Sequence, residues 1–242
     1  ANLGTIGDPR PVMDTQLLDT FAGSLVEPKG TRTTFNVDGA DRTVQHMPGY
    51  FTFFSDDETV ATTTAGVIRA VGAGQAVITA ALGQVPVLGE IRLSVSAPPD
   101  LPAPTPTLPA GDVISLFSNA YPDVPVKTWS AEWDQATVSD IRIDGDDVKA
   151  YTALSFAGIE FTEPTVDASS MTHFHLDVWV AEGNLFKVKL VDFGADGAFG
   201  GGDDREHELV FTPVSDPALQ VGTWVSLDLP FSSFTNLTTR AH

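Results

Sequence analysis

The side chains best suited to binding a ligand lie in the second half of the chain, which holds all four tryptophans. Trp129 and Trp133 share one short segment with Lys127, Glu132 and Asp134. That segment is too polar for a buried strand, and exposed indole rings are costly unless they stack on something. Flat rings with polar neighbours suit the CH faces and hydroxyls of sugars. The alternative, a loop folded back over the core, stays open.

A second candidate surface is the segment THFHLDVWV. If it is a strand, alternation separates two faces. The apolar face contains Phe174, Leu176, Val178 and Val180, and the mixed face contains His173, His175, Asp177 and Trp179. The next strand adds Lys187 and Lys189. These side chains suit a sugar-binding sheet face, and the alternative is a solvated outer face.

Two further interpretations concern histidine and tryptophan. His173 and His175, with His207 as a third ligand, have the residue types of a small metal site. Strand histidines without other support are usually not ligands. Trp224 precedes a strand, and we expect it at the edge of the core, with a role in ligand binding as the alternative.

A glycine-rich acidic loop follows the second candidate surface, between Asp192 and Glu208. Clustered carboxylates repel one another unless they are solvated or neutralised, and Ca²⁺ takes about six to eight oxygen ligands. The spacing is not that of an EF-hand. We therefore expect either a flexible acidic hairpin tip or a structural Ca²⁺ site, whose ligands would be Asp192, Asp196, Asp203, Asp204 and Glu206.

The elements that must position these residues fall into two halves. Ala97–Ala110 contains six of the 17 prolines, which fix φ and cannot donate to a ladder. We predict one domain at 1–97, a stiff linker at 98–110 and a second domain at 111–242. The chain begins at Ala1 without Met, so we expect a mature or excised product.

Both halves are predicted to be all-β, because short runs rich in Val, Ile, Thr and Phe alternate with Gly, Pro and Asp clusters. In the first half the expected strands are Gln16–Leu18, Thr31–Val37, Tyr50–Phe54, Val67–Val71, Gln75–Leu82 and Ile91–Ser96. In the second half they are Val113–Phe117, Val138–Ile143, Lys149–Phe156, Gly158–Phe161, Thr172–Val180, Leu185–Phe193, His207–Thr212 and Thr223–Leu229.

Charge restricts the partners. Residues 1–97 carry 6 basic and 10 acidic side chains, and residues 111–242 carry 7 basic and 21 acidic ones. The net charge of the whole chain is −19. This acidity disfavours nucleic acid and anionic lipid headgroups. No cysteine is present, which excludes disulfides and thiolate metal sites, and no apolar run is long enough for membrane insertion.

The first half carries a family resemblance. Phe53–Ala80 is FFSDDETVATTTAGVIRAVGAGQAVITA, which resembles the bacterial immunoglobulin-like group 2 domains. It departs from their pattern at Thr64-Ala65, where an aspartate is common, and at Gln75, where Thr is usual. The resemblance implies an immunoglobulin-like β-sandwich that serves as a spacer or adhesion module on exported bacterial proteins.

The second half resembles another family. Its segments DVISLFSNAYPDVPVKTWSAEWD, FAGIEFTEPTVDASSMTHFHLDVWV and KLVDFGADGAFGGGDDREHELVFT are similar to the non-catalytic module found beside glycoside hydrolase family sixteen β-glucanases and on Bacteroidetes surface glycan-binding proteins. The resemblance implies a jelly-roll carbohydrate-binding module. Relatives continue with further strands, so we expect a jelly roll that lacks its last strands.

Together these features predict a non-catalytic glycan-binding protein of the cell surface or extracellular space. From the resemblance alone, its ligand would be a β-1,3-glucan of laminarin type, captured for a neighbouring glycoside hydrolase domain or an outer-membrane uptake complex. The alternative is a structural subunit of a surface filament or envelope complex, in which another chain completes an open sheet edge.

Catalysis is not expected, although paired carboxylates are abundant. The E-x-D-x-x-E motif of family sixteen catalytic domains is absent, as are G-x-S-x-G, the P-loop and H-E-x-x-H.

Overall fold

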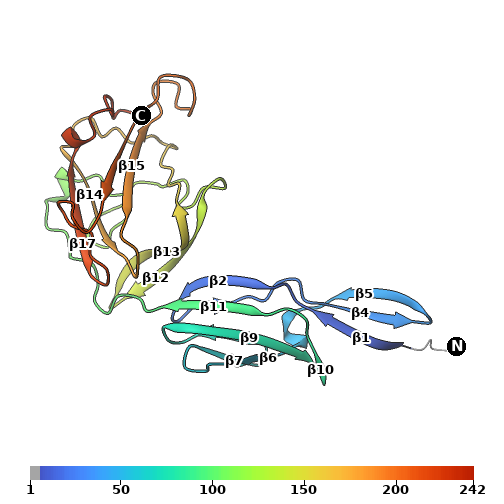
Figure 1. Ribbon diagram of the computed structural model, residues 1–242. Coiled ribbons are helices and arrows are strands. Elements are labelled where there is room, and N and C mark those ends of the chain that lie inside the picture. The colour runs from blue at the N-terminus through green and yellow to red at the C-terminus, as the bar shows by residue number, and fades with distance from the viewer. Residues whose placement is uncertain (1–5) are drawn as a thin grey trace. The chain divides into compact units, whose positions relative to one another are not determined.

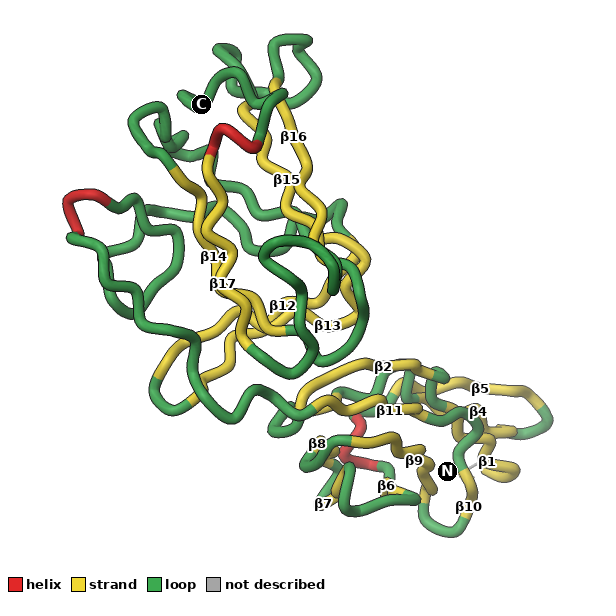
Figure 2. Tube along the Cα trace, turned by 60° about the vertical axis from the view of Figure 1, so that its left-hand side comes forward, coloured by secondary structure: helices red, strands yellow, loops and turns green. Residues whose placement is uncertain are grey.

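The computed structural model describes residues 6–242, in which strands provide nearly all regular structure (Figures 1 and 2). The helices of this range are three short 3-10 segments: η1 (Pro48–Tyr50), η2 (Ala110–Asp112) and η3 (Phe231–Ser233). No helix among the described residues is long and apolar enough to span a membrane. The predicted all-β class is confirmed.

The chain divides into two compact units. The first ends at Pro98 and the second spans Pro99–His242. Each unit has a hydrophobic core of its own. Most of the proline-rich segment that we predicted as a linker therefore belongs to the second unit.

The described part of the first unit contains three sheets. The sheet β1–β4–β5 consists of Ile6–Val12, Arg32–Val37 and Ala40–Gln45. The sheet β10–β9–β11–β2, with β6 also paired to β9, consists of Val85–Pro86, Gly74–Leu82, Ile91–Ser96, Gln16–Phe21 and Thr52–Ser55. The sheet β3–β8–β7 consists of Leu25–Val26, Val67–Ala70 and Ala61–Thr64.

The core of this unit is formed by the apolar residues that alternate along its strands. Ile78 of β9 and Ile91 of β11 are opposite one another in the antiparallel ladder, and both are fully buried. Ile68 of β8 joins the same cluster. Burying one such side chain contributes about 1.5–3 kcal/mol, so these strands hold the unit together.

The second unit is built from three antiparallel ribbons (Figures 1 and 2). They are β12 (Gln135–Ile143) with β13 (Asp146–Phe156), β14 (His173–Trp179) with β17 (Trp224–Pro230), and β15 (Phe186–Asp192) with β16 (Arg205–Phe211). Over residues 99–242, no ladder joins one ribbon to another. The core cluster comes from the last two ribbons and from Leu219, Phe234 and Leu237.

Two predicted strands of this unit are wrong. Val113–Phe117 and Gly158–Phe161 form only isolated bridges, Ser115 with Asp123 and Thr128 with Glu160. Both runs have strand-like composition, but they lie against loops and have no long partner among the described residues. Conversely, the sequence reasoning missed β1, β5 and β7 of the first unit, together with the two-residue strands β3 and β10. β1 contains two prolines, and every residue of β5 is exposed, which removes the alternation signal.

Candidate functional site

Trp129 packs against its own domain. Its ring meets Phe117 edge-on at 5.5 Å between centroids, and Lys149 Nζ lies 5.1 Å from the Trp129 ring and 5.0 Å from the Phe117 ring. Lys149 in turn donates to Asp140 Oδ1 at 2.6 Å. An ammonium ion held over two rings is a stabilising cation–π arrangement. This ring therefore has partners within the protein.

Tyr151 fastens the same loop to β13. Its hydroxyl donates to the carbonyl oxygen of Trp129 at 2.7 Å. Burial raises the pKa of Tyr151 to about 12, and the charges of Asp134 and Asp140 add to the effect. The phenol is thus neutral and a hydrogen-bond donor at ordinary pH.

Trp133, four residues further on, has the opposite environment. It is 63% exposed. Its ring stacks on Phe156, with 6.2 Å between centroids and 21° between planes. Its edge lies over Gly158, where a Cβ would come within 2.5 Å of Trp133 Cη2. Its Nε1 donates to Glu160 Oε1 at 3.3 Å. The indole is held by three neighbours and faces solvent.

Charged side chains border this ring. Lys127 Nζ lies 2.9 Å from Glu163 Oε1 and 3.7 Å from Glu160 Oε2. The hydrogen bond to Glu163 raises the pKa of Lys127 above its ordinary value. Asp134 accepts the N–H of Gly158 and so fixes the chain under the indole. The result is a flat apolar surface with hydrogen-bonding groups at its border.

The mixed face of β14 forms a separate polar cluster. His175 faces two carboxylates, with Nε2 3.5 Å from Asp177 Oδ2 and Nδ1 3.6 Å from Asp228 Oδ1. The hydroxyl of Ser226 donates to Asp177. Because it bonds to the aspartate and not to the imidazole, these groups do not form a serine nucleophile with its base. Trp179 is half-buried opposite Trp224 in the ladder.

The two predicted lysines pair with glutamates of β16. Lys187 Nζ lies 2.8 Å from Glu208 Oε1, and Lys189 Nζ lies 2.6 Å from Glu206 Oε2. These are exposed cross-strand ion pairs, each worth roughly 0.2–1 kcal/mol. The predicted ligand-binding residues therefore lie in three separate places. Trp129 and Trp133 contact side chains of β13, His175, Asp177 and Trp179 belong to β14, and Lys187 and Lys189 belong to β15.

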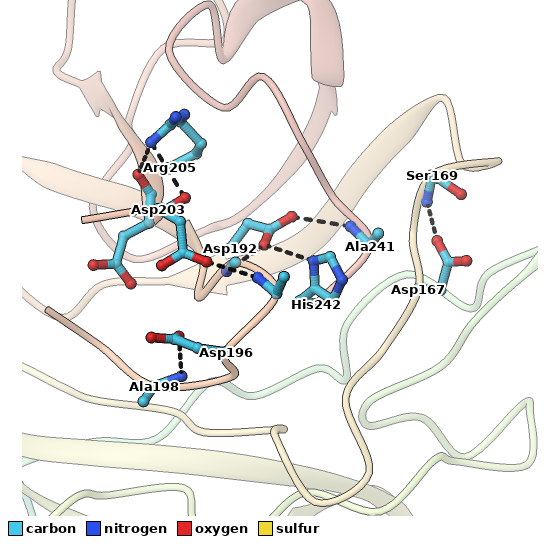
Figure 3. Close-up of polar contacts among 12 residues, drawn as sticks. Asp167, Ser169, Asp192, Asp196, Ala198, Asp203, Arg205, Ala241 and His242 are labelled. Atoms are coloured by element: carbon cyan, nitrogen blue, oxygen red, sulfur yellow. Dashed lines mark hydrogen bonds and ion pairs between the residues drawn. The ribbon is translucent and has the colours of Figure 1, made fainter. Parts of the chain in front are cut away.

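The acidic loop begins at Asp192, whose side chain is only 2% exposed. Figure 3 shows its carboxylate between the loop and the C-terminal segment. It accepts the N–H groups of Gly194 and Ala241, both at 2.9 Å, and His242 Nδ1 lies at 3.4 Å. Burial alone would raise the pKa of Asp192, but these hydrogen bonds, one from the Thr239 hydroxyl and the nearby His242 ring lower it overall.

The other predicted metal ligands have different surroundings. Asp196, Asp203 and Asp204 each accept one backbone N–H of the loop, from Ala198, Ala195 and Gly200. The Oδ1 atoms of Asp203 and Asp204 are buried and have no hydrogen-bond partner. Glu206 is paired with Lys189. Within residues 6–242, no group of three or more His, Asp or Glu side chains has an arrangement that could hold a metal ion.

His173 and His207, the other metal candidates, have separate partners. His173 Nδ1 lies 2.9 Å from Thr172 Oγ1. His207 Nδ1 accepts the N–H of Asn236 at 3.3 Å, and its ring packs edge-on against Phe234.

Sequence reasoning missed the residues that support Trp133, namely Phe156, Gly158 and Glu160. Phe156 is the last residue of β13, Gly158 and Glu160 follow it, and Phe161 extended the apparent strand pattern there. The only local signal was a glycine between an aromatic and an acidic residue. Their approach to Trp133 depends on the path of the intervening chain.

Comparison with known proteins adds no relative to this description: no protein-family model matches the chain, and no similar curated protein is found.

Proposed function

We propose that the protein is a non-catalytic, exported glycan-binding protein, in which residues 111–242 capture a polysaccharide. The observation that carries this proposal is Trp133. Exposing an indole to solvent normally costs free energy. This ring is nevertheless held in place: it stacks on Phe156, donates to Glu160 and lies close over Gly158, which has no side chain to displace it. A rigid aromatic surface loses little conformational entropy when a sugar ring stacks on it.

The charged border supports the same proposal. Lys127, Glu160 and Glu163 present donors and acceptors beside the ring, as sugar hydroxyls require. The similarity of the second half to modules beside β-glucanases suggests a β-1,3-glucan of laminarin type. It also suggests a neighbouring hydrolase or outer-membrane uptake complex as the recipient of the captured chain. The first half, as an immunoglobulin-like spacer, would present this jelly-roll module at the cell surface.

Affinity electrophoresis of the whole chain tests the proposal. Gels containing laminarin, mixed-linkage glucan, xylan or alginate are compared with a gel without polysaccharide. We expect laminarin to retard the protein and Trp133→Ala to abolish the retardation. Phe199→Ala is the matched control, because Phe199 is a 70% exposed aromatic residue elsewhere in the unit. Equal retardation of Trp133→Ala and the unsubstituted chain would exclude Trp133 as the binding surface.

A structural Ca²⁺ ion in the acidic loop is the second part of the proposal. The buried, unpartnered Oδ1 atoms of Asp203 and Asp204 suit a cation, and a Cβ at Gly201 would collide with Asp196 and approach Asp203 Oδ1 to 3.0 Å. The carboxylates do not form a ligand group in this structure, so Asp196, Asp203 and Asp204 would have to converge on the ion, with carbonyls and water completing its shell. Asp192 and Glu206 are less suitable, because hydrogen bonds and Lys189 already engage them.

The alternative function, a subunit of a surface filament or envelope complex, rests on the unpaired ribbons. β13 pairs only with β12 among the described residues, and Leu154 and Phe156 are exposed near its end. An edge of this kind can accept a strand from another chain. Sedimentation velocity at increasing protein concentration, without glycan, separates the two functions. Growth of larger species favours the subunit, and a constant monomer favours the glycan-binding protein.

A further inference from the structure

The proline-rich segment makes two hydrogen bonds with the body of the second unit. The indole Nε1 of Trp224, the first residue of β17, donates to the carbonyl oxygen of Leu101 at 2.8 Å. The hydroxyl of Tyr121 donates to the carbonyl oxygen of Leu108, also at 2.8 Å. Both donors come from aromatic side chains, and both acceptors are backbone atoms of the segment.

The chemistry of an extended proline-rich chain explains this pattern. Such a chain has no internal hydrogen bonds, so its carbonyl oxygens are free to accept from outside. At about 3.1 Å per residue, the seven steps from Leu101 to Leu108 span roughly 22 Å. Because proline already restricts the unbound chain, holding it in place costs little further entropy.

The exposure of the leucine side chains indicates that the backbone of the segment is what is recognised. Leu101 and Leu108 are 70% and 64% exposed, although their carbonyl groups are engaged. Apolar burial of these leucines is therefore not what holds the segment. Donation from an aromatic N–H or O–H to the carbonyls of an extended proline-rich chain is a recurrent mode of recognition.

We infer that Trp224 and Tyr121 form a docking track for an extended proline-rich strand, and that its occupant is residues 99–109 of the same chain. The segment is a strap fixed to the second unit at both ends, and not a free tether. In this inference Trp224 holds the strap and does not bind glycan.

Distance measurements between spin labels test this inference in the whole chain. The protein has no cysteine, so Thr105→Cys in the strap and Ser232→Cys after β17 supply the only two thiols. We expect one narrow distance distribution. Trp224→Phe or Tyr121→Phe removes one donor and should shift the ratio of docked to free strap about fivefold towards free, which broadens the distribution. The double variant should broaden it further.

Two matched variants serve as controls. Trp133→Phe removes an indole that bonds elsewhere, and Tyr151→Phe removes a phenol that bonds to Trp129. Both should leave the distribution narrow. A broad distribution in the otherwise unsubstituted chain, or a narrow one in the folded double variant, overturns the inference.

Hydrogen exchange gives a second test that needs no variant. The Trp224 indole N–H should exchange more slowly than a free indole, because the strap carbonyl accepts it. Exchange at the rate of a free indole would overturn the inference even if the substituted proteins fail to fold.

Discussion

Trp133 owes its orientation to the missing side chain at Gly158. We predict that Gly158→Ala tilts the indole away from Phe156, since the new Cβ would lie 2.5 Å from Cη2. Glucan affinity should fall at least about tenfold, or ~1.4 kcal/mol, and the Trp fluorescence should change. Calorimetric titration and emission spectra measure the two effects. Gly111→Ala is the control, because a Cβ there meets nothing within 4 Å. An unchanged affinity with a changed spectrum would show that the ring position is unimportant for binding.

Asp192 is a buried carboxylate whose ionisation contributes to stability. Because its folded pKa lies below the ordinary value of 3.8, the carboxylate stabilises the fold above that value. The contribution disappears as the pH falls through the lower, folded pKa. We predict that Asp192→Asn costs about 1–3 kcal/mol at pH 7 and flattens the loss of stability below pH ~4. Urea unfolding between pH 2.5 and 7 measures both, and parallel curves for the two proteins would contradict this role.

At the scale of elements, the loop between β15 and β16 gives the next prediction. If Ca²⁺ binds there, saturating the site at about a hundred times its Kd should stabilise the second unit by ~2.7 kcal/mol. Asp203→Asn should remove most of the effect, whereas Glu206→Gln should preserve it, since Glu206 pairs with Lys189. Thermal unfolding with EDTA, Ca²⁺ or Mg²⁺ provides the measurement. Identical midpoints with and without Ca²⁺ would leave the loop as an acidic hairpin tip.

The elements also show how far a single sequence can be interpreted. The alternation in β14 predicted its faces, because Phe174, Leu176 and Val178 pack on the core while His175 stays exposed. Val113–Phe117 is also rich in strand-forming residues, yet it pairs only through Ser115. Strand formation there depends on a distant partner, which local pattern does not encode. The bracing of Trp133 was unpredictable for the same reason.

At the scale of the whole molecule, two separate cores predict two unfolding transitions. Calorimetry should resolve one transition for each unit. A glucan at about a hundred times its Kd should raise only the second unit's midpoint, by roughly 5–10 °C. Trp133→Ala should abolish the shift without merging the transitions. A shift of the first unit's transition would place the binding surface in the wrong half of the chain.

The uneven acidity makes the two units respond differently to salt. Residues 111–242 carry 21 acidic and 7 basic side chains, whereas residues 1–97 carry 10 and 6. Like charges repel in the compact state, and raising the salt from 0.01 M to 0.1 M shortens the screening length from about 30 Å to about 10 Å. We therefore predict that KCl, with EDTA present, raises the second midpoint more than the first. Equal shifts would mean that local ion pairs such as Lys187–Glu208 already neutralise the excess, leaving solubility as the consequence of the net charge.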